Sequence, residues 1–127
     1  MINKLGQVML YVNNQEEAKR FWTDTVGFQV VADETNGEMR WIEIAPESGS
    51  ETTIILHNKE MVAKMSPGLN LNTPSLMFFT DDLDQVYSHL SDQHITVGEI
   101  VEMPVGRVFN FADNEENYFA VMEKSKE

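Results

Sequence analysis

A strand and a helix can be read directly from residues 9–28, MLYVNNQEEAKRFWTDTVGF. The opening apolar run, residues 9–12, is typical of a strand. Asn13 or Asn14 then offers a helix N-cap, ahead of acidic residues that the helix dipole favours in a first turn. Apolar side chains recur at the spacing of one helix face, at Ala18, Phe21, Trp22 and Val26. Gly27 is expected to end this helix.

The same strand-then-helix pattern returns in the second half of the chain. Residues 77–80, MFFT, form an apolar run, and Asp81 or Asp82 offers an N-cap. A second amphipathic helix face follows, with Leu83, Val86, Tyr87 and Leu90. Each half of the chain therefore opens with a strand and a helix, which indicates an internal repeat.

Strand-like segments follow both predicted helices. In the first half they are residues 28–32, 39–45 and 52–57. Polar turns separate them at residues 33–37 and 46–50. In the second half the strand-like segments are residues 95–102, 107–111 and 118–123. A short helix is expected at residues 59–64, and residues 66–74, which contain Pro and Gly, connect the two halves.

These elements predict an α+β fold made of two paired βαβββ modules. A chain of 127 residues is expected to form a single domain, 1–127, with modules at about residues 1–65 and 73–127. The helices would cover one face of the sheets and leave the other face free.

Composition excludes several classes of protein. The hydrophobic fraction of 42% and the charged fraction of 24% are ordinary for a globular chain, so intrinsic disorder is excluded. Without cysteine, the chain has no disulfides, thiolate nucleophiles or cysteine-ligated metal sites. The sequence has no apolar run of the ~20 residues that a membrane span needs, and its start lacks a signal-peptide pattern. We therefore expect a cytoplasmic protein with no membrane partner.

The net charge of −12 bears on which partners the protein can bind. So acidic a chain repels phosphate backbones, and we expect no nucleic-acid partner. In one interpretation the excess of acidic residues serves solubility. In the other, it forms an acidic cleft that attracts a cationic ligand.

Three segments carry a resemblance to a known family. They are the opening strand at residues 6–12, the helix end Ala18…Phe21-Trp22…Val26-Gly27-Phe28, and the turn FADNEEN at residues 111–117. Together they resemble the vicinal oxygen chelate superfamily, which includes glyoxalase I, bleomycin-resistance proteins and extradiol dioxygenases. The resemblance covers essentially the whole chain. It implies a cupped mixed sheet around a cleft, helices on the outer face, and a homodimer.

The resemblance also locates the positions at which metalloenzymes of this superfamily carry metal ligands, usually His or Glu. In this chain those positions hold Gln7, Ile55, Ser75 and Ala120. Ile55 and Ala120 have no donor atom in their side chains, and Gln7 and Ser75 are weak neutral donors. We therefore expect no metal and no other cofactor at the usual site. The sequence leaves open whether the protein is an enzyme.

A displaced metal site is the alternative. Gln7, Glu43 and His57 could together hold a divalent metal, since His57 lies two residues beyond Ile55 on the same side of a strand. Otherwise, a histidine at the end of a strand is most often an ordinary surface residue. A displaced site would make the protein a glyoxalase-like lyase or a dioxygenase-like oxygenase that polarises substrate oxygens.

Strand alternation sorts side chains onto the face that the helices leave free. If Gln7 faces the cleft, the residues that share this face are Gln7, Met9, Tyr11, Trp41, Glu43, Ile55, His57, Ser75, Met77, Phe79, Ala120 and Met122. Further candidates for the rim are Met103, Arg107 and Phe109. This aromatic and Met-rich set suits a planar organic ligand, with Glu43 to meet a cation. The same residues could instead fill a closed core or a dimer interface.

The functional hypothesis is a metal-independent small-molecule binding protein that resembles the bleomycin-resistance branch. That branch binds cationic drugs without chemistry, so the resemblance implies sequestration of a cationic or aromatic compound by a homodimer. The alternatives are the metal-dependent lyase or oxygenase, and a module that binds an ordinary metabolite. Fold alone does not separate these functions.

Overall fold

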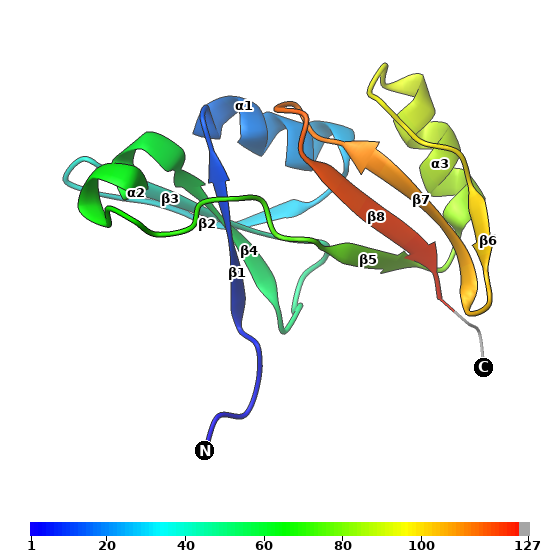
Figure 1. The fold of residues 1–127 in the computed structure, drawn as a ribbon, viewed down its shortest axis with the longest axis horizontal. Helices are drawn as coiled ribbons and strands as arrows, with labels where there is room; N and C mark the ends of the chain where they lie inside the picture. Colours follow the sequence, from blue (N-terminus) through cyan, green and yellow to red (C-terminus); the bar gives the residue numbers. More distant parts are fainter. Residues whose placement is uncertain (125–127) are drawn as a thin grey trace. The chain divides into compact units, whose positions relative to one another are not determined.

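The computed structural model describes residues 1–124 of the chain. Its contacts divide the chain into two compact units, Met1–Thr73 and Pro74–Glu127. Figure 1 shows the course of the chain through both units. Within the described residues, each unit contains one four-stranded sheet. No helix in residues 1–124 combines the length and the apolar character that a membrane crossing needs.

The first unit begins with strand β1 (Gln7–Val12), helix α1 (Gln15–Arg20) and a π-helical turn, η1 (Phe21–Thr25). The elements that follow are strands β2 (Gln29–Asn36), β3 (Met39–Ala45) and β4 (Thr53–Asn58) and helix α2 (Lys59–Met65). The strands lie in the order β1-β4-β3-β2. β1 is parallel to β4, and the other neighbouring strands are antiparallel.

The second unit repeats this topology. Its elements are β5 (Met77–Thr80), α3 (Leu83–Asp92), β6 (Val101–Met103), β7 (Gly106–Ala112) and β8 (Tyr118–Glu123). The strand order is β5-β8-β7-β6, with β5 parallel to β8 and the other pairs antiparallel. The repeat confirms the predicted α+β fold of two βαβββ modules.

The predicted helix starts are confirmed. The side chain of Asn14 accepts a hydrogen bond from the backbone N–H of Glu17 (3.0 Å), and that of Asp82 accepts one from Gln85 (3.1 Å). Each bond satisfies a first-turn donor that the helix itself leaves unpaired. Helix α2 matches the short helix expected at residues 59–64.

The first helix differs from the prediction in its last turn. The apolar spacing predicts a continuous α-helix as far as Val26. After Arg20 the chain instead widens into η1, where the N–H of Val26 donates to the carbonyl of Phe21 (3.1 Å). Phe21 and Trp22 are nevertheless buried, with their ring planes at 89° to each other. The spacing of the apolar residues identifies the buried face of the helix, but it does not reveal that one helical turn contains an extra residue.

Strand β2 is longer than predicted. The polar residues 33–37 are expected to form a turn, yet β2 continues to Asn36. Asp33 accepts hydrogen bonds of 2.9 and 2.7 Å from Arg40 of β3, and one of 2.8 Å from Lys19 of α1. The bonds from Arg40 and Lys19 hold the pKa of Asp33 well below its usual range. Because these charges pair across elements, a polar sequence is stable here as an edge strand.

The predicted strand at residues 95–102 pairs with β7 only in pieces. An isolated bridge joins Val97 to Phe111, and the N–H of Gly98 donates to the carbonyl of Asn110 (2.7 Å). The continuous strand β6 starts only at Val101. A glycine within a strand pattern is typical of such an interruption.

Alternate strand residues pack against the helices and form the core of each unit. In the first unit they include Leu10, Val12, Ile42, Ile44 and Leu56, with Ala18 and Trp22 from the helical segment. In the second unit they include Phe109, Phe111, Phe119 and Val121, with Leu83 and Leu90 from α3. Full burial of one large apolar side chain contributes about 1.5–3 kcal/mol.

The turn between β7 and β8, within the segment 111–117 singled out in the sequence, is built around the buried side chain of Asp113. Asp113 accepts hydrogen bonds from the backbone N–H groups of Glu115 (2.8 Å) and Asn117 (2.9 Å), and from the side-chain amide of Asn117 (3.1 Å). Glu116 closes the turn with a positive φ of 63°. These bonds lead the chain into β8, so this segment serves the fold.

A buried amide joins α1 to strands β3 and β4. The Nε2 group of Gln15 donates to the carbonyl oxygens of Arg40 (2.6 Å) and Leu56 (3.0 Å). Gln15 is buried, so water does not easily replace it as the donor. The amide therefore ties the helix to two neighbouring strands.

Replacing Gln15 by Leu roughly keeps the size of the side chain but leaves both carbonyls without this donor. We expect Q15L to lower the free energy of unfolding by about 1–3 kcal/mol, measured by urea denaturation. Q85L, at the exposed Gln85 of α3, is the matched control and should change stability by less than about 0.5 kcal/mol. A Q15L variant as stable as the wild type would contradict this role of the amide.

Candidate functional site

The register of the first sheet sets four side chains in one row across β1, β4, β3 and β2. Tyr11 lies opposite His57, His57 lies opposite Trp41, and Trp41 lies opposite Glu34. Directly opposed residues of neighbouring strands point to the same face of a sheet. We call Tyr11, His57, Trp41 and Glu34 the aromatic row.

A second row runs beside the aromatic row. Met9 lies opposite Ile55, and Ile55 lies opposite Glu43. Gln7 lies opposite Thr53, whose hydroxyl donates to the Glu43 carboxylate (2.7 Å). One face of this sheet therefore carries all the residues predicted for the cleft from the first half, Gln7, Met9, Tyr11, Trp41, Glu43, Ile55 and His57.

His57 is more enclosed than the surface histidine that its place near a strand end suggests. Its ring stacks on that of Tyr11, with centroids 6.0 Å apart and planes at 21°. Its Nδ1 atom is buried and, within residues 1–124, has no hydrogen-bond partner. Burial disfavours the charged form and lowers the pKa of His57 from its ordinary value of 6.5. The imidazole is therefore neutral at neutral pH.

In the second unit, the predicted residues of β5 and β8 also share a face. Met77 lies opposite Ala120, and Phe79 lies opposite Met122. Met77 and Phe79 are 48% and 66% exposed, whereas Met122 is buried. Ser75 is exposed and lies just before β5. This sheet therefore has an apolar face of its own, with exposed side chains on its edge strand.

Two of the three residues expected at the rim lie on the other face of the second sheet. Phe109 is buried, and its ring packs edge-on against Tyr87 of α3, with centroids 5.1 Å apart. Arg107 lies on the same side as Phe109 and bonds Asp84 of α3. The rim assignment is wrong for both, because it depends on a strand register that spacing alone does not define. Met103 is exposed.

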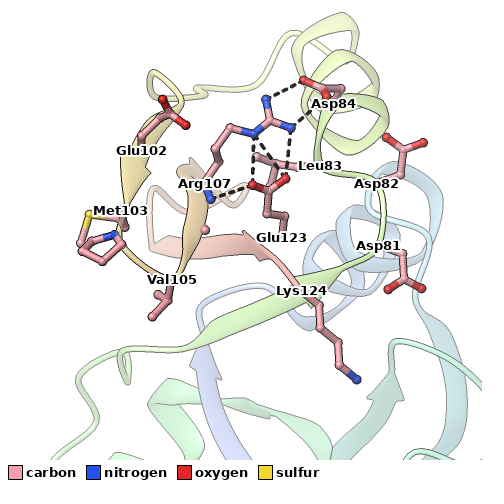
Figure 2. A pocket seen from close by; sticks show the side chains of 12 residues that line it. Asp81, Asp82, Leu83, Asp84, Glu102, Met103, Val105, Arg107, Glu123 and Lys124 are labelled. Atoms are coloured by element: carbon pink, nitrogen blue, oxygen red, sulfur yellow. Dashed lines mark hydrogen bonds and ion pairs between the residues drawn. The ribbon is translucent and has the colours of Figure 1, made fainter. Parts of the chain in front are cut away.

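A hollow of about 830 Å³ lies in the second unit, lined by the start of α3, the β6–β7 hairpin and the end of β8. Figure 2 shows how Arg107 joins Asp84 and Glu123 there, with Nη2 to carboxylate oxygen distances of 3.0 and 3.1 Å. The guanidinium holds the pKa of both carboxyl groups below their usual range. This hollow had no signal in the sequence, because its charged residues come from segments that no spacing rule links.

The side chains at the usual metal-ligand positions do not fit a metal ion. Ile55 and Ala120 end in carbon atoms, and their strand partners Met9 and Met77 add no hard donor. In the part of the chain that the structure describes, no group of three His, Asp or Glu side chains could hold a metal ion.

The alternative metal set, Gln7, Glu43 and His57, shares a face but is spread across it. The three residues lie on β1, β3 and β4, in three successive rows. Successive rows are separated by roughly 6.5 Å along a strand. The Glu43 carboxylate also accepts the hydroxyl of Thr53. These side chains would have to rearrange before they could bind one ion together.

The βαβββ topology, which occurs in both units, indicates the class of protein to which the chain belongs. Residues 4–121 match the family model of the Glyoxalase/Bleomycin resistance protein/Dioxygenase superfamily. The chain therefore belongs to this superfamily, as its opening strand, helix end and turn predicted.

Individual relatives extend this comparison. YetH, an uncharacterized protein of Bacillus subtilis strain 168, is 34% identical over 125 residues, which are 97% of this chain and 100% of YetH. TnmS3, an antibiotic binding protein from Streptomyces sp. CB03234, has a crystal structure that matches with a TM-score of 0.83 and 28% identity over 98% of both chains. A superfamily member from Sphaerobacter thermophilus DSM 20745 matches with a TM-score of 0.80 and 25% identity over 97% of this chain and 98% of its own.

The enclosed His57 predicts a pH dependence of stability. As the pH falls below about 6.5, the unfolded chain takes up a proton at His57, whereas the folded chain does so only at a lower pH. The His57 contribution to the free energy of unfolding therefore decreases as the pH falls, until the folded-state pKa is passed. H57F should remove this contribution and flatten the profile, measured by urea denaturation across this range.

The control for this measurement is W41F, which changes the ring opposite His57 without removing a titrating group. It should keep the wild-type slope of stability against pH. A wild-type slope in H57F would contradict the enclosed, neutral state of His57.

Proposed function

We propose that this protein binds a planar aromatic compound, cationic or uncharged, without a bound metal and without changing it chemically. The observation that carries the proposal is the aromatic row on the free face of the first sheet. Such a function resembles that of the bleomycin-resistance branch of the superfamily. The similarity to TnmS3, an antibiotic binding protein, also supports it.

The aromatic row supplies the contacts that such a ligand needs. Tyr11, His57 and Trp41 are half-buried, so neighbouring residues hold their rings while part of each ring stays open for stacking. Glu34 ends the row beside Trp41, and Glu43 lies in the neighbouring row. A cationic group placed near Trp41 would meet both a ring face and a carboxylate.

We also propose that the apolar face of the second sheet is a ligand-contacting surface of its own unit, through Ser75, Met77, Phe79, Ala120 and Met122. The exposure of Met77 and Phe79 favours this assignment, because neighbouring exposed apolar side chains are typical of binding surfaces. The homodimer that the family resemblance implies remains a prediction.

Trp41 gives a direct test of ligand binding. It is half-buried on the proposed face, whereas Trp22 is fully buried in the core. Titration with a panel of cationic aromatic drugs should give saturable quenching of tryptophan fluorescence. W41F, which keeps Trp22, should lose most of this quenching. Without saturable quenching by any compound of a broad panel, the proposed function would be overturned.

A matched pair of charge variants controls the same titration. E43Q removes a carboxylate from the proposed face and should weaken binding of a cationic drug by about 2- to 5-fold. E47Q makes the same change at an exposed turn residue and should leave the affinity unchanged. Equal effects of the two variants would indicate only a general influence of net charge.

The proposal also predicts the metal content of the purified protein. Because the side chains of Ile55 and Ala120 have no donor atoms, tag-free protein should retain only trace metal after incubation with Ni, Zn, Mn or Fe(II) and dialysis. Elemental analysis by inductively coupled plasma mass spectrometry measures this. Near-stoichiometric metal that is lost in E43A or H57A would contradict metal independence and favour the lyase or oxygenase alternative.

A further inference from the structure

We propose that the Nε2–H group of His57 selects among aromatic ligands, favouring those that place an acceptor oxygen, such as a ketone, over the middle of the aromatic row. This inference rests on the proposed function and names the chemical class of its ligand. His57 lies between Tyr11 and Trp41, one strand away from each. A planar ligand that stacks on both of these rings therefore also covers His57.

The two ring nitrogens of His57 have different surroundings. Nδ1 is buried and, in the described part of the chain, lacks a hydrogen-bond partner. The stack against Tyr11, at 6.0 Å and 21°, holds the plane of the imidazole. The residue as a whole is only half-buried, so Nε2 is the polar atom that its open part offers to a ligand.

The position of the ring proton follows from these surroundings. The lowered pKa of His57 leaves a neutral ring with one N–H at neutral pH. A proton on Nδ1 would be a buried donor without an acceptor, which folded proteins rarely tolerate. We therefore assign the proton to Nε2, where water can accept its hydrogen bond in the ligand-free protein.

Covering this N–H penalises ligands that lack an acceptor. A ligand that displaces water from Nε2–H without offering an oxygen leaves the donor unpaired, whereas a ketone oxygen at the same place restores the hydrogen bond. The Glu43 carboxylate does not itself accept the Nε2–H group of His57, because Glu43 lies in the next row and accepts the hydroxyl of Thr53. His57 therefore adds a polar requirement to a surface that otherwise binds by stacking.

Two matched probes measure the contribution of the acceptor oxygen to the affinity. Aminomethyl-fluorene and aminomethyl-fluorenone share a planar ring system and an ammonium group, and they differ by a ketone oxygen in place of two hydrogens. Calorimetric titration of the wild-type protein near neutral pH should show about 3- to 10-fold tighter binding of the fluorenone. H57F keeps a ring in the row and keeps the N–H of Trp41. It should bring the affinity ratio close to one without weakening the fluorene probe.

Further variants complete the test. H57Q retains a side-chain donor and should keep part of the preference, while H89F, at an exposed histidine of α3, should keep all of it. If H57F does not fold, H57L gives the same comparison. Equal affinity ratios in the wild type and H57F, with both probes bound, would overturn the role of His57 and leave the proposed function standing. Failure of the wild type to bind either probe or any drug of the panel would overturn both.

Discussion

The buried amide of Gln15 is the contact on which the candidate site depends. It donates to the carbonyls of Arg40 on β3 and Leu56 on β4, and each of these residues immediately precedes a member of the aromatic row. Trp41 and His57 point to the free face of the sheet, whereas the amide comes from α1 on the face that carries the core. The helix side therefore stabilises the register that sets Trp41 opposite His57. Packing on one face of the sheet therefore positions the side chains of Trp41 and His57 on the other face.

Much of the fold can be predicted from the sequence because its signals are local. The caps at Asn14 and Asp82 need only a carboxylate or amide a few residues before a backbone donor. Alternation along a strand likewise needs only neighbouring residues, and it identifies the core-facing side chains of β1 and β3, such as Leu10 and Ile42. On β4 and β8, however, Ile55 and Met122 were expected on the free face and are buried. The length of β2 could not be predicted in this way, because Asp33 is stabilised by Arg40 and Lys19 on other elements.

The candidate site was predicted as a set of residues but not as an arrangement. Alternation placed Tyr11, Trp41 and His57 on one face, yet only the pairing of three strands sets them in a row. The enclosure of His57 depends on the ring of Tyr11, which is distant in the sequence, so its neutral state had no sequence signal. The ion pair between Arg107 and Glu123 was not predicted for the same reason, since it follows from the pairing of β7 with β8 and the position of α3.

The carbon side chains at two of the positions that the family resemblance assigns to metal ligands agree with the rest of the proposed site. Ile55 and Ala120 lie on β4 and β8, each an inner strand of its sheet. A coordinating side chain there would bring further charge and water to the middle of a face, whereas a carbon side chain adds apolar surface beside the aromatic row and favours stacking over coordination. A neutral His57 fits this surface better than an imidazolium would, because a charged ring would repel a cationic ligand. The neutral ring can stack, and it still keeps one N–H with which to distinguish one aromatic ligand from another.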